Sequence, residues 1–316
     1  MTQDNSSIHK KQILFIAGYG RSGSTLMERL LSQVAGITAT GEICHIWRRG
    51  FGENQLCGCE SSFASCPFWS GVAGYFSAKG QDPEAALASG RRVTRLRNLL
   101  QILYPALRSS RFRRDFACYQ ESLRILYDAI ADRNDGNVIV DSSKDPMHGL
   151  ILATLPNVDL RVLHLVRDSR GVAFSWMRKK IRPEIQKSEA FMPVFSPTRS
   201  SLVWNLKNSL SEILKKRAGS YLRIRYEDLV SFPSETIERV IRGLGLNVPS
   251  INTEFIAGHS AHLDVDHTCA GNPLRFRRGE LTIKLDAAWR DEMNARDRRY
   301  VTMLTYPWLR MYGYLK

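Results

Sequence analysis

Near its N-terminus the chain reads ILFIAGYGRSGSTL over residues 13–26. An apolar run at 13–17 precedes a glycine-rich turn and a segment of helical character, which predicts a strand, a phosphate-binding loop and a helix. Gly18 and Gly23 have the spacing of a Walker A motif. The lysine of that motif is missing, and Ser24 stands at its position. Such a loop still binds phosphate through its N–H groups and the positive end of the helix, although it is less suited to cleaving a triphosphate.

A second strand-to-helix segment carries groups that can bind an anion. Residues 161–166 read as a buried strand, and Arg167 follows it directly. Ser175 lies eight residues further on, in the helix predicted next. An arginine fork and a serine hydroxyl at this spacing can converge on one phosphate group. The alternative for Arg167 is a surface ion pair with Asp168.

These segments resemble the signatures of sulfotransferases that use 3′-phosphoadenosine 5′-phosphosulfate (PAPS). In that family the first loop holds the 5′-phosphosulfate, which implies this role for Arg21, Ser22, Gly23, Ser24, Thr25 and Leu26. The arginine and the serine of the second segment grip the 3′-phosphate, which implies Arg167 and Ser175. Two weaker matches are Tyr226, expected near the nucleotide, and a basic clamp over the 3′-phosphoadenosine formed by Arg277, Arg278 and Gly279. Arginine in the first loop is typical of the bacterial, carbohydrate and tyrosyl-protein branches, whereas the cytosolic phenol enzymes have lysine there.

Glu42 is the candidate general base. It follows a short predicted strand, so it should lie at the same edge of the sheet as the phosphate loop. The resemblance implies the same role, because related branches place a glutamate there. His45, three residues further on, is the alternative base.

Two cations are the other candidate catalytic groups. Lys144 follows the strand predicted at 138–140, and the tyrosyl-protein branch has a similarly placed lysine that contacts the transferring group. The alternative is that Lys144 pairs with Asp141 or Asp145. Arg21 should lie over the 5′-phosphosulfate and stabilise charge on the leaving group.

The pattern along the chain predicts the α/β class. Strands alternate with helices, which indicates a P-loop-like three-layer fold with a central, mainly parallel sheet flanked by helices. We expect a flexible N-terminus over residues 1–11 and a single domain over residues 12–316. Within that domain we expect an irregular insertion at 43–80, helices at 84–104 and 113–133, a flap at 181–199 and a long loop at 258–280.

The net charge of +14 favours anionic ligands, such as a phosphorylated and sulfated cofactor or an acidic acceptor. No recognised nucleic-acid motif accompanies the charge, so we expect no nucleic-acid partner. The apolar run at 13–17 is too short for a signal sequence or a membrane span, so we expect a soluble, cytoplasmic protein.

Cys57, Cys59 and Cys66 cluster in the sequence with Cys44. A metal site that also uses His45 is conceivable, but the spacing C-x-C-x6-C is not a standard zinc pattern. We therefore expect a compact loop that could form part of the acceptor wall, and no metal ion.

The predicted reaction moves a sulfuryl group from PAPS to a hydroxyl of a carbohydrate or glycolipid, by in-line attack with a glutamate base. The alternative acceptors are a peptide tyrosine and a small metabolite. The alternative functions are a P-loop kinase-like nucleotide enzyme, which would want the missing lysine and a Mg²⁺ site, and a non-catalytic protein that binds anions.

Overall fold

The structure, a computed structural model, describes residues 10–133, 137–179 and 191–315. At its centre lies β1 (Lys11–Gly18), the predicted first strand. Leu14 and Ile16 point into one hydrophobic core, and Ile13 and Phe15 point into another. Both faces of the strand are therefore buried, which explains its continuous apolar run.

The central sheet has five strands in the order β2-β3-β1-β4-β5, and every pairing is parallel. The predicted mainly parallel sheet is thus confirmed. The partners of β1 are β2 (Ile37–Ala39), β3 (Val138–Asp141), β4 (Val158–Val166) and β5 (Ser220–Arg225). Phe15 is in register with Asp141 and Gly18 with Leu165, so the loops that follow these strands are neighbours at one edge.

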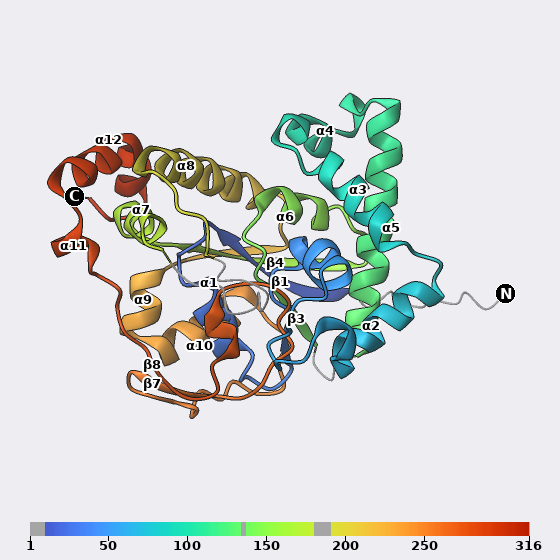
Figure 1. Ribbon diagram of the computed structural model, residues 1–316, viewed down its shortest axis with the longest axis horizontal. Coiled ribbons are helices and arrows are strands. Elements are labelled where there is room, and N and C mark those ends of the chain that lie inside the picture. The colour runs from blue at the N-terminus through green and yellow to red at the C-terminus, as the bar shows by residue number, and fades with distance from the viewer. Residues whose placement is uncertain (1–9, 134–136, 180–190, 316) are drawn as a thin grey trace.

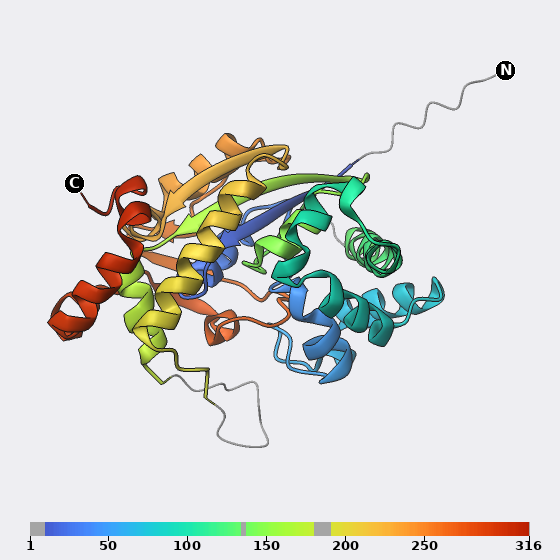
Figure 2. The same ribbon diagram turned by 90° about the horizontal axis from the view of Figure 1, so that it is seen from above.

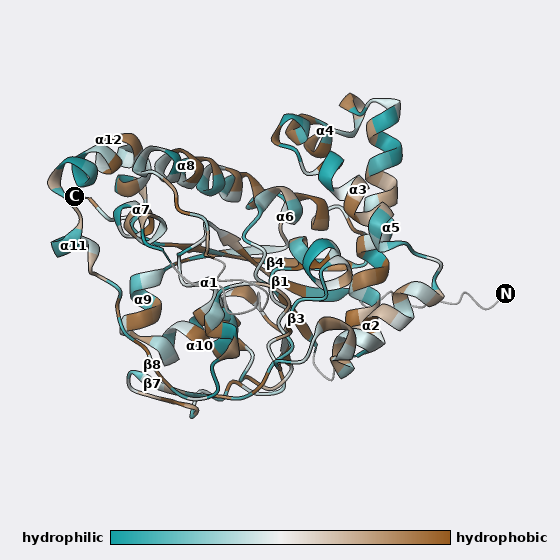
Figure 3. Cartoon of the chain, in the orientation of Figure 1, coloured by the Kyte–Doolittle hydropathy of each residue, from teal (hydrophilic) through white to brown (hydrophobic). Residues whose placement is uncertain are grey.

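Helices cover both faces of the sheet and complete three layers (Figures 1 and 2). The core on one face is completed by α1 (Ser24–Leu31), α9 (Tyr226–Ser231) and α10 (Pro233–Leu244). The core on the other face is completed by α5 (Ser110–Asp132), α6 (Pro146–Leu152) and α8 (Pro197–Leu214). Helices α5 and α8 carry both hydrophilic and hydrophobic residues, as expected for helices with one face on a core (Figure 3).

The remaining elements lie around these layers. The other helices are α2 (Pro67–Ala78), α3 (Pro83–Val93), α4 (Leu99–Leu103), α7 (Ser169–Met177), α11 (Trp289–Glu292) and α12 (Ala295–Met311). A second, antiparallel sheet contains β6 (Ile256–Ala257), β7 (Ser260–Leu263) and β8 (Gly279–Thr282). Within the described ranges, no helix combines the length and the apolar character needed to cross a membrane.

Three expected elements are wrong in part. The insertion at 43–80 is not wholly irregular, because Pro67 begins α2, a helix of 12 residues. The helix expected at 84–104 breaks after Val93, where the side chains of Thr94 and Asn98 donate to carbonyls of the last turn of α3. The long loop expected at 258–280 contains β7, whose residues are alternately buried and exposed. This strand pairs with the later β8.

Two further expectations concern the ends of described segments. Residues 1–9 of the expected flexible N-terminus lie outside the described residues, whereas Lys11 already belongs to β1. Of the expected flap at 181–199, residues 181–190 lie outside the described residues, and Pro197 begins α8.

Replacing Leu163 by alanine should lower the free energy of unfolding by about 2–5 kcal/mol, because the side chain is fully buried in β4 and its truncation leaves a cavity. Urea denaturation measures the change. The matched control is Leu202→Ala in α8, where the leucine is 56% exposed and the expected change is below about 0.5 kcal/mol. Equal losses in the two variants would contradict the burial of Leu163 in the core beside β4.

Candidate active site

The carboxyl edge of the sheet opens into a cavity of about 570 Å³. Nine of the residues predicted from the sequence line it, and so does the alternative base, His45. These nine are Arg21, Gly23, Ser24, Thr25, Leu26, Glu42, Lys144, Ser175 and Tyr226. The other predicted residues, Ser22, Arg167, Arg277, Arg278 and Gly279, are not among those that line it.

The phosphate loop is shaped for close approach to a ligand. Gly23 has φ +86°, and a Cβ there would lie 2.5 Å from the ring of Tyr226, so only glycine fits. A Cβ at Gly20 would lie 2.8 Å from the ring of Trp176. Helix α1 begins at Ser24, and no side chain caps its N-terminus. Its first N–H groups are therefore available to an anion.

Arg21, in this loop, lines the cavity and has a hydrogen-bond donor without a partner. Its guanidinium carbon lies 4.6 Å from the centroid of the Trp176 ring, and Nη2 lies 2.9 Å from the sulfur of Met192. Its Nε is buried and has no hydrogen-bond partner. A buried donor of this kind is costly unless a ligand accepts its hydrogen bond. The loop and Arg21 together fit a phosphate or sulfate group.

Glu42 and Lys144 form a buried ion pair at the end of β2 and β3. Lys144 Nζ lies 2.6 Å from Glu42 Oε1 and also donates to the carbonyl of Ser142 at 2.7 Å. Both side chains are only about an eighth exposed (13% and 14%). Lys144 has φ +58°, a left-handed conformation that residues other than glycine seldom adopt. The two predicted catalytic residues therefore face the same cavity.

The alternative partners of Lys144 are engaged elsewhere. Asp145 pairs with Lys207, with Nζ 2.9 Å from the carboxylate. Asp141 is fully buried and accepts a hydrogen bond from Tyr127 Oη at 2.7 Å, and His148 Nε2 lies 3.2 Å away.

The charge state of the pair follows from its surroundings. Burial alone would raise the pKa of Glu42, but Lys144, and after it His45, lower that pKa to about 2. Burial lowers the pKa of His45 to about 4, against the opposing effect of Glu42, whose carboxylate lies 3.5 Å away. At neutral pH the site therefore holds a carboxylate beside a neutral imidazole, and both groups are in the unprotonated form that a general base requires.

Glu28 holds the two turns that carry this ion pair. Its carboxyl oxygens accept hydrogen bonds from the N–H of Gly41 and from the hydroxyl of Ser142, both at 2.7 Å. Gly41 precedes Glu42, and Ser142 precedes Ser143 and Lys144. Burial raises the pKa of Glu28 to about 8. A second link is the N–H of Cys44, which donates to Ser143 Oγ at 2.9 Å.

Sequence reasoning missed three cations that line the cavity: Arg49, Lys207 and Lys284. Nε of Arg49 is buried and has no hydrogen-bond partner, as for Arg21. Arg49 lies in a π-helical turn, Trp47–Gly52, inside the segment expected to be irregular, so no periodic pattern marked it. Arg21, Arg49 and Lys207 give the cavity a cationic lining.

Arg167 lies beside the phosphate loop and outside the cavity. Its guanidinium donates to the carbonyl of Arg21 at 3.0 Å and lies 4.6 Å from the centroid of the Tyr226 ring. It also donates to the carbonyl of Asp286 and lies 3.1 Å from its carboxylate. The surface pair with Asp168 does not form, because Asp168 pairs with Arg170 at 2.6 Å.

The residues of the expected basic clamp, 277–279, do not line the cavity. The carbonyl of Arg277 accepts a hydrogen bond from Arg29 at 2.7 Å. Arg278 donates to the carbonyl of Cys59 at 3.1 Å, and Gly279 begins β8.

Comparison with known proteins identifies the family of the chain. Residues 13–250 match the sulfotransferase family, and the chain belongs to that family. No curated protein matches the chain.

Solved structures that resemble the chain include three sulfotransferases. The sulfotransferase domain from the curacin biosynthetic pathway is 18% identical, with a TM-score of 0.49 over 93% of this chain and 96% of that one. A sulfotransferase from Mycobacterium avium is 11% identical, with a TM-score of 0.48 over 95% and 76%. A sulfotransferase from Alicyclobacillus acidocaldarius is 14% identical, with a TM-score of 0.37 over 77% and 85%.

The stability of the chain should depend on pH through Glu42. Its pKa is about 2 in the folded chain, whereas a glutamate in an unfolded chain titrates near about 4.3. The ionised carboxylate therefore stabilises the fold above about pH 4, and this contribution is lost as the pH falls toward about 2. The stability difference between wild type and Glu42→Gln should shrink by about 2 kcal/mol from pH 5 to pH 3.

Urea denaturation across this pH range measures the difference. The control is Glu53→Gln, which removes a carboxylate that is 46% exposed and should show no comparable trend. A difference between wild type and Glu42→Gln that does not change with pH would contradict the ion pair.

Proposed function

We propose that this sulfotransferase takes its sulfuryl group from PAPS and transfers it to a hydroxyl of a carbohydrate or glycolipid, with Glu42 as the base. The observation that carries the proposal is the Glu42–Lys144 pair, 2.6 Å across, in the same cavity as the phosphate loop. A base, a cation and an anion cradle in one cavity are what sulfuryl transfer to a hydroxyl requires.

The donor would be held by groups on both sides of the sheet edge. The loop residues from Arg21 to Leu26 would bind the 5′-phosphosulfate, and the unpartnered Nε of Arg21 supports this role. Arg167 and Ser175 would bind the 3′-phosphate, with Tyr226 beside the nucleotide. The clamp formed by Arg277, Arg278 and Gly279 would close over the 3′-phosphoadenosine, although these residues do not line the cavity in this structure.

PAPS supplies the sulfuryl group. The acceptor oxygen bonds to sulfur while the bond between sulfur and the 5′-phosphate oxygen breaks, and the electron pair of that bond stays on the phosphate oxygen of the leaving PAP. Glu42 takes the proton of the acceptor hydroxyl at a carboxylate oxygen. Arg21 and Lys144 stabilise negative charge on the transferred and leaving oxygens. We propose that these fixed cations make a divalent metal in the cavity unnecessary.

The ion pair also offers a way to adjust the strength of the base. A carboxylate with a pKa of about 2 is a weak proton acceptor. An anion bound near Lys144 competes with Glu42 for the ammonium group. As that interaction weakens, the burial of Glu42 raises its pKa toward the range of an effective base.

The lining of the cavity supports an acidic acceptor. Arg49 and Lys207 lie in the same cavity as His45 and Glu42, and the chain carries a net charge of +14. A sugar with carboxylate or sulfate groups would complement these charges. A peptide tyrosine in an acidic sequence and a small anionic metabolite are the alternative acceptors, and transfer from labelled PAPS to a panel of the three classes distinguishes them.

A kinase-like function is the second candidate, because the loop has Walker-like glycine spacing. The Walker A lysine, which reaches the terminal phosphates of a nucleoside triphosphate, is absent from this loop. Calorimetric titration with adenosine 3′,5′-bisphosphate (PAP) and with ATP separates the two. Tighter binding of PAP supports the proposal, and tighter binding of ATP would contradict it.

Glu42→Gln should reduce turnover by about 10²–10⁴-fold, because a positioned general base contributes that much. Its affinity for PAP should stay near that of the wild type. Sulfate transfer from labelled PAPS and calorimetry with PAP measure the two effects. Normal turnover in Glu42→Gln, together with an inactive His45→Ala variant, would transfer the role of base to His45.

Arg167→Ala should weaken binding of PAP by more than about tenfold while leaving adenosine 5′-phosphosulfate, which lacks the 3′-phosphate, nearly unaffected. Ser175→Ala should show the same preference more mildly. The matched control is Arg170→Ala, because Arg170 pairs with Asp168 and does not line the cavity. Equal losses for both ligands would show that Arg167 supports the fold of the loop instead.

A further inference from the structure

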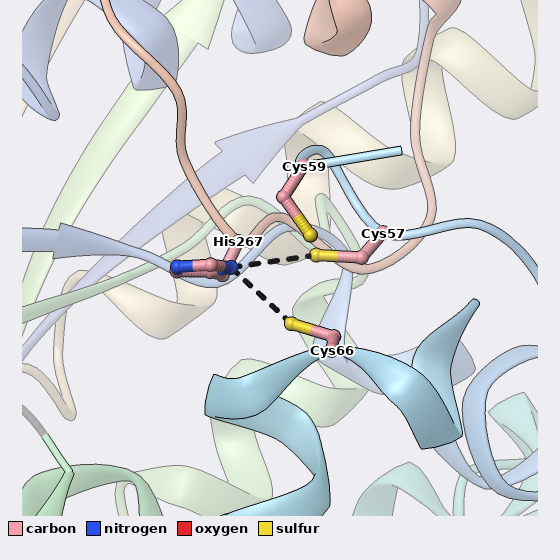
Figure 4. Close-up of side chains that lie close together, drawn as sticks. All are labelled: Cys57, Cys59, Cys66 and His267. Atoms are coloured by element: carbon pink, nitrogen blue, oxygen red, sulfur yellow. Dashed lines mark hydrogen bonds between the residues drawn. The ribbon is translucent and has the colours of Figure 1, made fainter. Parts of the chain in front are cut away.

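A cluster of three cysteines and one histidine lies outside the catalytic cavity. One ligand atom from each side chain lies within 4.8 Å of all the others. Figure 4 shows the four side chains gathered around one point, with His267 facing the three sulfurs of Cys57, Cys59 and Cys66.

We propose that these four side chains bind one zinc ion as a closed, structural site. Three thiolates and one imidazole are an established ligand set for structural zinc, and four protein ligands leave no open position for a substrate. The site is therefore separate from the transfer reaction proposed above and does not depend on it.

The distances fit a tetrahedral ion. At usual zinc bond lengths, the edges of the tetrahedron are about 3.8 Å between two sulfurs and about 3.5 Å between sulfur and nitrogen. Nδ1 of His267 lies 3.2 Å from Sγ of Cys66 and 3.8 Å from Sγ of Cys57. Only small side-chain movements are needed to place an ion at the centre.

Backbone hydrogen bonds fix the turn that carries two of the cysteines without any metal ion. Cys57 and Cys59 share a tight turn, in which the N–H of Cys57 donates to Ser61 and the N–H of Glu60 donates back to Cys57, both at 2.8 Å. Glu60 adopts the left-handed conformation, with φ +69°. Cys66 lies at the N-cap of α2, where the helix dipole favours a thiolate.

His267 is fixed by the same helix. The ring of Phe68 stacks on the imidazole, with the centroids 5.4 Å apart and the planes 3° from parallel. The indole N–H of Trp69 donates to the carbonyl of His267 at 2.6 Å. Three thiolates and Zn²⁺ leave one negative charge, and Arg278 donates to the carbonyl of Cys59 beside it.

A disulfide between two of the cysteines explains this arrangement less completely than a zinc ion does. It would join two of the cysteines and leave the third thiol and the imidazole without a role, whereas zinc uses all four. The expectation of no metal rested on the spacing C-x-C-x6-C, which is not a standard zinc pattern. Cys44 and His45, the other residues considered there, contact Ser143 and Glu42. The fourth ligand is His267, which lies 201 residues after Cys66.

The zinc site would fasten one wall of the catalytic cavity. The N–H of Gly58 donates to the carbonyl of Thr268 at 3.0 Å, and Cys57 pairs with Cys269 in an isolated β-bridge. The carbonyl of Cys269 in turn accepts the N–H of Glu42 at 2.9 Å. An ion that joins Cys57 and His267 therefore holds the backbone on which Glu42 rests.

Metal analysis of the purified full-length chain, produced with zinc in the medium, tests the proposal. We expect one zinc per chain in the wild type and a loss of most of it in Cys66→Ser and His267→Ala. Two controls should keep their zinc: Cys118→Ser, an exposed cysteine, and Cys269→Ser, a buried one next to the site. Little zinc in the wild type, equal zinc in all variants, or a Cys57–Cys66 disulfide in the unreduced protein would overturn the proposal.

A second measurement needs no variant. Replacing zinc by Co²⁺ in the wild type should give the intense visible bands and the thiolate charge-transfer absorption of a tetrahedral site with sulfur ligands. Stripping the metal with a thiol-reactive mercurial and a chelator should lower the melting temperature by about 5–10 °C, and zinc added with excess thiol should restore it. An octahedral cobalt spectrum, or a melting temperature that does not change, would contradict a structural zinc.

These results are distinguishable from a failure of the proposed function. A chain that holds zinc but does not bind PAP supports the zinc site and contradicts the PAPS proposal. A chain that binds PAP but holds no zinc does the reverse.

Discussion

The site depends on one buried electrostatic pair, Glu42 with Lys144, at the carboxyl edge of the sheet. Two charges removed from water must be closely matched, because an unpaired one would cost several kcal/mol. The chain meets this demand by fixing both turns, and Glu28 contacts the backbone of one and a side chain of the other. The short β2 and β3 are parallel neighbours, so the residues after them reach the same point. Their register therefore determines where chemistry can occur.

The surrounding interactions extend this constraint to the rest of the cavity. Helix α1 begins at the phosphate loop and carries both Glu28 and Arg29. Arg29 forms a buried ion pair with Asp266 and donates to the carbonyl of Arg277, which fixes the loop between β7 and β8. The donor loop, the proposed base and the proposed metal site are thus connected through one helix of eight residues. A disturbance of α1 would reach all three.

Much of the fold could be predicted from the sequence because its signals are local. The strand, loop and helix around residues 13–26 and the strand before Arg167 are marked by apolar runs and glycines. Strand ends of a parallel sheet meet at one edge, so the sequence also placed Glu42 and Lys144 together.

What the sequence could not provide are contacts between distant residues. His267 joins cysteines some 200 positions earlier (His267 to Cys66 spans 201), and nothing in the local pattern connects them. Arg49 lies in a π-helical turn without hydrophobic periodicity. The pairing of β7 with β8 depends on a partner 16 or more residues away along the chain. The sequence also offers Asp141 and Asp145 as partners of Lys144, whereas packing brings Glu42 to the lysine.

The measurement that tests the central account most directly is a crystal structure of the chain with PAP bound. The account predicts the 5′-phosphate against the N–H groups of the loop from Arg21 to Thr25, with Glu42 and Lys144 facing the space beyond that phosphate and Arg167 near the 3′-phosphate. PAP bound elsewhere on the chain, or bound in the cavity with its 5′-phosphate pointing away from Glu42 and Lys144, would contradict it.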